Sequence, residues 1–180
     1  MNTGKIWRWA VVLVQGVTIF GITMCAPTPE PTPTPDAVFS TEAEAFAAAE
    51  ETYRAYFDAL NQVDVSDPKT FEPLFALTTG EAYESDRKTM SEYHARKWTK
   101  TGDVVVTSFS GTEFDPDSFS VAATACLDVS GTLLTDSAGE SVVPPERADT
   151  YSVDLGFDWT GSDLKISTSY PTPDEACASR

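Results

Sequence analysis

Apolar residues recur at helical spacing in the segment that follows residue 40, and together they form one stripe. The stripe consists of Phe46, Ala49, Tyr53, Tyr56, Phe57 and Leu60. This spacing predicts a single amphipathic helix that ends near Leu60. Its start is predicted at Thr41-Glu42-Ala43-Glu44, because a threonine followed three residues later by a glutamate forms a capping box.

Two further helices are predicted between residues 67 and 102. Asp67-Pro68 offers an N-cap and a first-turn proline for a short helix, which Pro73 bends or ends. Thr78-Thr79-Gly80-Glu81 has the spacing of a second capping box, and the helix that it opens is expected to end near Gly102. The apolar positions of this helix are Tyr83, Met90, Tyr93 and Trp98.

From Asp103 onward apolar and polar residues alternate. This two-residue period is typical of β-strands with one buried and one solvent-exposed face. The expected inward positions are Val105, Thr107 and Phe109; Phe119, Val121, Ala123, Ala125, Leu127 and Val129; Tyr151, Val153, Leu155, Phe157 and Trp159; and Leu164, Ile166, Thr168 and Tyr170. A smaller hairpin is predicted over residues 132–143. Helices followed by antiparallel strands predict the α+β fold class.

An apolar run of a different kind opens the chain. Lys5 and Arg8 precede a mostly apolar stretch at residues 9–26, which is the pattern of an export signal. Residues 1–25 are therefore predicted to be a signal, lipoprotein-like or membrane-anchor segment. A Pro/Thr-rich linker at 26–38 follows, held in an extended polyproline conformation, and a globular domain is predicted at 39–180.

Three fates are open for the export segment. Ile22-Thr23-Met24-Cys25 resembles a bacterial lipobox, in which Cys25 becomes the lipidated first residue, although Met24 replaces the small residue that normally precedes this cysteine. The alternatives are an uncleaved signal anchor and release by signal peptidase. The first two place the domain on the outer face of the cytoplasmic membrane, and the third makes the protein secreted.

The chain has three cysteines, Cys25, Cys126 and Cys177. Because an exported domain meets an oxidising compartment, Cys126 and Cys177 are predicted to form a disulfide. The alternative is a pair of buried free thiols.

Charge narrows the range of partners. Lys and Arg number 12 against 28 Asp and Glu, which gives a net charge of −16. Such a surface repels phosphate backbones, so we expect no nucleic-acid partner. A cationic partner fits this charge, although solubility alone also accounts for it.

Five basic residues nevertheless cluster in and after the third predicted helix. They are Arg87, Lys88, Arg96, Lys97 and Lys100. An anion site is one interpretation. The spacing favours a structural role, because Glu84–Lys88 and Glu92–Arg96 stand four residues apart in the stabilising orientation.

No cofactor or metal ion is predicted. One histidine and three scattered cysteines lack the spacing of a zinc site. Glu113, Asp115 and Asp117 resemble a calcium loop only loosely, and a capped turn is the preferred interpretation. Neither a phosphate-binding glycine loop nor a nucleophile elbow occurs in the sequence.

The order of elements, the helix AEAFAAAEETYRAYFDALNQVD and the stretch ACLDVSG at 125–131 resemble the nuclear-transport-factor-two-like superfamily, also called SnoaL-like. The resemblance implies a cystatin-like cone, in which N-terminal helices pack on a curved antiparallel β-sheet. Small exported actinobacterial proteins with a lipobox-like segment and a Pro/Thr stalk look similar. The superfamily includes isomerases, dehydratases and many members with no known catalysis.

Enzymes of this family place Asp, Tyr or His inside the cone, so the resemblance makes Tyr53, Tyr56, Asp58 and His94 candidates. Asp58 lies beside the apolar stripe and is expected to face solvent, and a lone histidine such as His94 is expected to be half-exposed and inert. The first hypothesis is an envelope-anchored, non-enzymatic domain that binds a ligand or an envelope protein, or has an accessory role in cell-surface machinery. The second is a pocket enzyme of isomerase or dehydratase type, and the third is a structural spacer. The sequence specifies neither the ligand nor the oligomeric state.

Overall fold

The computed structural model describes residues 38–172 and Cys177. The predicted export segment 1–25 and all but the last residue of the predicted linker 26–38 lie outside these residues. The helical elements are α1 (Glu42–Asn61), the 3-10 turn η1 (Pro68–Phe71), α2 (Glu72–Phe75) and α3 (Gly80–Arg96). The strands are β1 (Thr99–Thr101), β2 (Val105–Asp115), β3 (Ser120–Asp128), β4 (Leu133–Thr135), β5 (Thr150–Trp159) and β6 (Leu164–Thr172). Within the described part of the chain, no helix is both long enough and apolar enough to cross a membrane.

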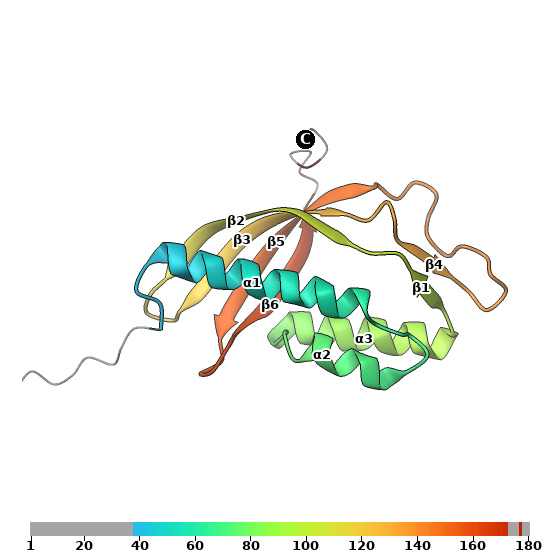
Figure 1. Cartoon of the computed structure of the whole chain (residues 1–180), viewed down its shortest axis with the longest axis horizontal. Helices are drawn as coiled ribbons and strands as arrows, with labels where there is room; N and C mark the ends of the chain where they lie inside the picture. The colour runs from blue at the N-terminus through green and yellow to red at the C-terminus, as the bar shows by residue number, and fades with distance from the viewer. Residues whose placement is uncertain (1–37, 173–176, 178–180) are drawn as a thin grey trace, which may run out of the picture. The chain divides into compact units, whose positions relative to one another are not determined.

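The helices pack on an antiparallel sheet, as the sequence predicts. The larger sheet has the strand order β2-β3-β5-β6, and β1 pairs with β4 in a separate two-stranded sheet. Helix α1 runs lengthwise across one face of the larger sheet, with α2 and α3 beside it, and β1 and β4 extend beyond the end of that sheet (Figure 1). The prediction of an α+β fold is confirmed.

Helix α1 begins at the predicted capping box. The hydroxyl oxygen of Thr41 accepts a hydrogen bond from the backbone N–H of Glu44 at 3.2 Å. The Glu44 carboxylate in turn accepts from the backbone N–H of Ser40 at 2.8 Å, so two N–H groups at the helix start are satisfied. The residues that α1 buries are Ala45, Ala49, Tyr53 and Phe57, spaced four apart.

Helix α3 begins at Gly80, within the predicted segment, but its cap and its end differ from the prediction. The second capping box is wrong, because the segment before α3 is bound to the sheet: Thr79 N–H donates to the Ile166 carbonyl at 2.8 Å, and no side chain caps the helix. The expected end near Gly102 is also wrong. Lys97 adopts a left-handed conformation with φ of 56° and ends the helix, so Trp98 follows it and β1 begins at Thr99.

Strand β3 follows the predicted alternation. Its inward residues Val121, Ala123, Ala125 and Leu127 are all buried, and the intervening positions are half-exposed. The structure also forms part of the predicted hairpin at 132–143, through an isolated bridge between Thr135 and Ser141, but β4 takes β1 as its ladder partner.

Irregularities in the ladder change the predicted inward faces of β2 and β6. The β2–β3 register shifts between Val106 and Ser108, so Val106 packs against the core while Val105 is 52% exposed. The β5–β6 register shifts at Gly156 and Phe157, so Phe157 pairs with Ile166 whereas Gly156 pairs with Thr168. A one-residue slip moves every following side chain to the other face, which is why alternation alone misplaces these positions.

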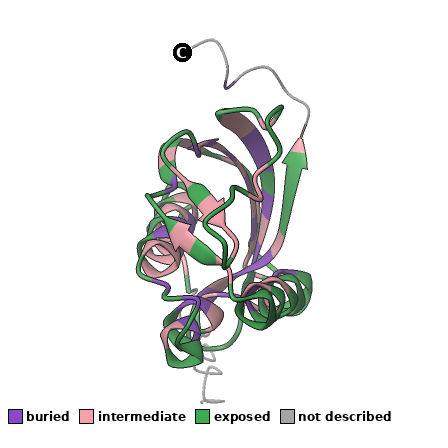
Figure 2. Ribbon diagram, turned by 90° about the vertical axis from the view of Figure 1, so that its right-hand side faces the viewer, coloured by how far each residue is buried: buried purple, intermediate pink, exposed green. Residues whose placement is uncertain are grey.

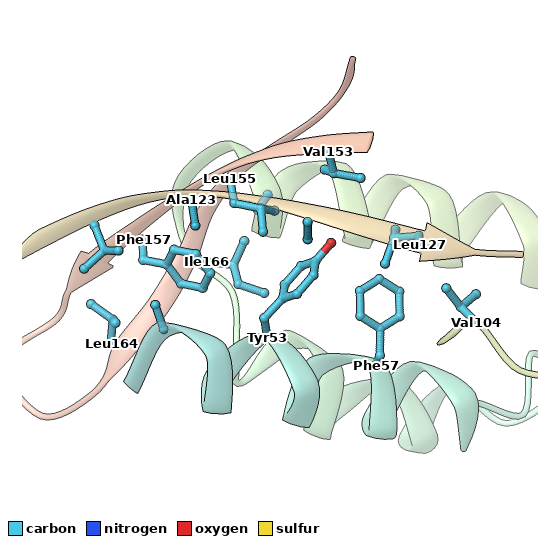
Figure 3. Packing of buried hydrophobic residues seen from close by; sticks show 14 of the residues in the cluster. Tyr53, Phe57, Val104, Ala123, Leu127, Val153, Leu155, Phe157, Leu164 and Ile166 are labelled. Carbon is cyan, nitrogen blue, oxygen red and sulfur yellow. The ribbon is translucent and has the colours of Figure 1, made fainter. Parts of the chain in front are cut away.

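The main core lies between α1 and the larger sheet (Figure 3). Phe157, Tyr53 and Ile166 are at most 1% exposed, and the Tyr53 ring packs edge-on against Phe57 with their centroids 5.0 Å apart. A second, smaller cluster joins α2 and α3; its buried members are Val63, Val65, Phe71, Leu74 and Met90. Figure 2 shows buried residues along the strands and exposed residues on the outer turns of the helices.

The predicted pairing of Cys126 with Cys177 is present on the other face of the sheet. Cys126 alternates with the inward residues of β3, and its Cα lies 5.5 Å from that of Cys177, to which it is disulfide-bonded. Cys177 is buried, and so is Ser152, which pairs with Cys126 from β5. The bond therefore joins the C-terminal segment to the centre of the sheet.

Candidate functional site

A cavity of about 330 Å³ lies between α1, α3 and β6. Helix α1 contributes Tyr53 and Tyr56, α3 contributes Glu81 and Asp86, and β6 contributes Tyr170. The remaining lining residues are small or aliphatic. The cavity thus combines aromatic and acidic side chains with hydroxyl and aliphatic ones.

The helical repeat of α3 points Asp86 toward α1. Asp86 stands four residues after Ala82 and four before Met90, and both of these neighbours are buried. Residues four apart lie on one helix face, so this face presents a carboxylate between two apolar side chains. The sequence pattern predicts Tyr83, Met90, Tyr93 and Trp98 as the apolar positions of this helix and does not include Asp86.

Tyr56 and Asp86 are hydrogen-bonded to one another across the cavity. The Tyr56 hydroxyl donates to Oδ1 of Asp86 at 3.0 Å. The other carboxylate oxygen, Oδ2, is buried and has no hydrogen-bond partner among residues 38–172 and Cys177. The same holds for the hydroxyl of Tyr53, a residue that is only 1% exposed. Two buried polar atoms therefore remain unpaired at this site.

The Asp86 carboxylate is half-buried and forms no salt bridge with the described residues. Salt bridges in the described part of the chain join Arg54 to Glu50 and Arg96 to Glu92, and neither involves Asp86. Burial raises the pKa of Asp86 from 3.8 to about 6, and the hydrogen bond from Tyr56 partly opposes this rise. At neutral pH the carboxyl is therefore mostly ionised, at a cost in desolvation.

The tyrosine hydroxyls at the site remain protonated. Burial raises the pKa of Tyr53 well above its ordinary value, and the nearby Tyr151 hydroxyl adds to the effect. Burial also raises the pKa of Tyr56, where the negative charge of Asp86 acts in the same direction. Both hydroxyls can therefore donate a hydrogen bond at any physiological pH.

A second hollow of about 390 Å³ adjoins the first, and Tyr56 and Asp86 line both. This second hollow is more apolar, and its wall includes Trp98. It also holds two basic residues. Burial lowers the pKa of Lys100, whose ammonium donates to the Gly102 carbonyl, and Arg147 donates to two backbone carbonyls.

The fold resembles solved structures at low sequence identity. The intermembrane space region of the chloroplast protein ARC6 is 16% identical and superposes with a TM-score of 0.52, covering 72% of this chain and 97% of that chain. A protein of Novosphingobium aromaticivorans, assigned as an aromatic ring hydroxylase, is 13% identical with a TM-score of 0.51, covering 73% of this chain and 96% of that one. The chain has the nuclear-transport-factor-two-like fold. No protein-family model and no curated protein matches the sequence.

Within this cone, two of the four candidate residues come together. Tyr53 and Tyr56 both line the cavity. Asp58 is exposed, as expected from its place beside the apolar stripe. His94 is also exposed, with Nδ1 2.9 Å from the Val65 carbonyl oxygen, and it does not line the cavity. The sequence therefore predicted the aromatic half of the site and missed its acid.

The other sequence candidates lie elsewhere on the cone or outside the described residues. Cys25 belongs to the latter, so its lipidation stays a prediction. Asp115 caps a turn, because its two carboxylate oxygens accept hydrogen bonds from Asp117 N–H at 2.9 Å and Ser118 Oγ at 2.7 Å. Across residues 38–172 and Cys177, no group of three or more His, Cys, Asp or Glu side chains is arranged to hold a metal ion.

One of the two ion pairs predicted for the basic cluster on α3 is present. Arg96 pairs with Glu92 at 2.9 Å and lies over the Trp98 ring, with 5.1 Å from its Cζ to the ring centroid. The other predicted pair, between Glu84 and Lys88, is not among the salt bridges of the described residues.

Proposed function

We propose that the chain is an extracytoplasmic, envelope-anchored domain that binds a small ligand in the cavity between α1, α3 and β6. The export pattern at residues 1–25 supports the location, and the Cys126–Cys177 disulfide fits an oxidising compartment. The cavity supports the binding role. In this proposal the domain holds its ligand without transforming it.

The two unpaired polar atoms carry the binding proposal. Buried polar groups in proteins are normally hydrogen-bonded, since leaving one unpaired costs about 1–3 kcal/mol. Oδ2 of Asp86 and the hydroxyl of Tyr53 are both left without partners beside the same cavity. A hollow with a few convergent polar groups is the common form of a ligand site. A structural spacer has no need of this arrangement.

The size of the cavity limits the ligand. At about 330 Å³ it lies near the lower end of the range of ligand pockets, about 300–1,000 Å³. We therefore expect a small molecule.

A cavity-filling substitution tests the binding proposal. Ser85 lines the cavity from an exposed position on α3, so Ser85→Trp places an indole there without disturbing the core. Ser91→Trp introduces the same side chain at an exposed α3 position that lines neither hollow. Full-length protein purified from its host is denatured, and released small molecules are identified by mass spectrometry. Wild type and Ser91→Trp should release the same molecule, and Ser85→Trp should release much less of it. Equal release from all three proteins, or none from any, would refute binding at this cavity.

The proposed anchoring has its own test. Intact-mass analysis of membrane-fraction protein compares the wild type with Cys25→Ala. Lipid mass on the wild type that is absent from the variant establishes lipidation at Cys25. A full-length unmodified chain in the membrane fraction instead supports the uncleaved anchor.

A second candidate function, a small enzyme of isomerase or dehydratase type, is favoured by one observation. A carboxyl with a pKa of about 6 beside a protonated tyrosine is suited to general acid–base catalysis near neutral pH. The small molecule that the denatured wild type releases in the binding test decides between the two functions. Incubation with fresh protein should return it unchanged if the domain only binds. Conversion that stops in Asp86→Asn would establish the enzyme instead.

A further inference from the structure

The charges around the cavity define the class of ligand, an inference that rests on the proposed binding function. The described residues that line the cavity include two carboxylates, Glu81 and Asp86, and no Lys, Arg or His. Glu81 lies at the exposed rim, where its carboxylate accepts a hydrogen bond from the Tyr170 hydroxyl. Both carboxylates belong to α3, which forms one wall of the cavity. The electrostatic potential inside the cavity is therefore negative.

Asp86 supplies a charge that the protein leaves uncompensated. Burying a carboxylate is costly unless a cation or several hydrogen bonds accompany it. Tyr56 provides one hydrogen bond, to Oδ1, while Oδ2 is buried and unpaired among the described residues. A positively charged ligand group in the cavity, beside this carboxylate, would supply the missing counter-charge.

Aromatic rings complete this environment. Tyr53, Tyr56 and Tyr170 line the cavity, and the first two rings are nearly parallel, with 4° between their planes and 6.4 Å between their centroids. Tyrosine rings attract cations through their negative faces, most strongly where water is excluded. Carboxylates combined with aromatic walls are typical of sites for organic ammonium groups.

We propose that the cavity binds a small organic cation, an amine or a quaternary ammonium compound. Its charged group lies beside the Asp86 carboxylate, and its carbon substituents contact the tyrosine rings. Ca²⁺ or Mg²⁺ fits less well, because these ions take six or more oxygen ligands and the described residues offer no cluster of three acidic, Cys or His side chains. The adjoining hollow shares Tyr56 and Asp86 with the cavity, but Lys100 and Arg147 also line it and make it less favourable for a cation.

A titration with three probes of similar shape and different charge tests this proposal. Benzyltrimethylammonium is the cation, benzyl alcohol the neutral probe and benzoate the anion. Each is added to the full-length protein, and binding is followed by NMR chemical-shift changes of the residues around the cavity. We expect the cation to bind more tightly than either other probe. In Asp86→Asn its affinity should fall roughly tenfold or more, which is the effect of losing a charge-assisted contact.

Asp58→Asn is the matched control. It makes the same isosteric change at an exposed position of α1 that does not line the cavity, and its affinity for the cation should equal that of the wild type. Equal losses in both variants would mean that net charge alone attracts the probe, and this would overturn the proposal. Thermal unfolding of each variant confirms that any lost binding does not come from lost structure.

The remaining outcomes separate this inference from the proposed function. If benzyl alcohol or benzoate binds at the cavity as tightly as the cation, the ligand class is wrong while ligand binding stands. If no probe binds the wild type, the cation inference fails too. The proposed function is then judged independently, by the molecule that the wild type releases and Ser85→Trp does not.

Discussion

The two sides of helix α1 face different environments. One side presents Ala45, Ala49, Tyr53 and Phe57 to the sheet, where these residues are at most 7% exposed. The other side presents Tyr56 to α3, where it meets a half-buried carboxylate at the edge of two hollows. A single helix therefore borders both the closed core and the cavity.

The difference lies in what each side contributes to stability. Apolar burial against the sheet stabilises the fold, by about 25 cal/mol for each Å² removed from water. The unpaired atoms at the cavity have the opposite effect, because Oδ2 of Asp86 and the Tyr53 hydroxyl lose water without gaining a partner. Groups that reduce stability are typically kept where function requires them. Truncating an apolar side chain of the core should therefore destabilise the protein, whereas removing an unpaired polar atom beside the cavity should stabilise it.

The largest effect is expected from Phe157→Ala in the core. Phe157 is 0% exposed, and its ring packs against those of Tyr53 and Phe109, with centroids 6.4 and 6.1 Å away. Truncation leaves a cavity among close-packed side chains and should lower the free energy of unfolding by about 3–5 kcal/mol. Urea unfolding of the disulfide-intact protein measures it. Val105→Ala, at a position that is 52% exposed, is the control and should cost less than about 0.5 kcal/mol. Similar losses in both variants would contradict the assignment of the core.

The disulfide should contribute nearly as much, and without affecting the cavity. Cys126 and Cys177 are 51 residues apart in sequence, so their bond restricts a long loop of the unfolded chain. We expect Cys126→Ala combined with Cys177→Ala to lower the free energy of unfolding by about 2–4 kcal/mol. Because Cys126 lies on the sheet face opposite the helices, affinity for a cavity ligand should be unchanged. If the free energy of binding falls by as much as the free energy of unfolding, the attachment of the C-terminal segment through Cys177 shapes the cavity.

The closed side of α1 is the part that the sequence predicts best. Its apolar stripe, its capping box and the alternation of β3 all follow from local periodicity, and the structure contains them. The misplaced positions in β2 and β6 have a common cause. A bulge adds one residue on one strand, and its place depends on the partner strand, which single-strand alternation does not describe.

The cavity side was predictable only in part. Tyr53 and Tyr56 belong to the stripe of α1, so periodicity places them inward. Asp86 lies in a run of polar residues, which suggests a solvated face. Its spacing from Ala82 and Met90 is the available signal, since all three share one helix face. Whether that face meets water or α1 depends on how the two helices pack, and the sequence of α3 does not determine this.

On the cavity side, Asp86→Asn should stabilise the protein. The rise in the pKa of Asp86 from 3.8 to about 6 sets an upper bound of about 3 kcal/mol on the cost of its ionised form in the folded state. Because the side chain is only half-buried, solvent screening reduces the expected gain to about 1–2 kcal/mol at neutral pH. Urea unfolding at pH 7 measures it, with Asp58→Asn as the control that changes stability little. Destabilisation by Asp86→Asn would show that the carboxylate has a structural role.

This gain should depend on pH in a defined direction. Between pH 3.8 and about 6 the folded state keeps a proton on Asp86 that the unfolded state releases, so the penalty grows as the pH rises through this window. Above about pH 6 the penalty is complete, and below 3.8 it is absent. The difference in stability between Asp86→Asn and the wild type should therefore shrink as the pH falls from 6 to 4. Comparing the two proteins at each pH cancels the other titrating groups.

The smallest effects distinguish the two tyrosines of the cavity. Tyr53→Phe removes a hydroxyl that has no partner among the described residues and keeps the ring in the core, so it should stabilise the protein by about 1 kcal/mol. Tyr56→Phe removes the donor to Oδ1 of Asp86 and should destabilise it by about 1 kcal/mol. Thermal and urea unfolding measure both. If Tyr53→Phe destabilises the protein instead, its hydroxyl is held by solvent in the cavity, and Asp86 alone is left to anchor a ligand.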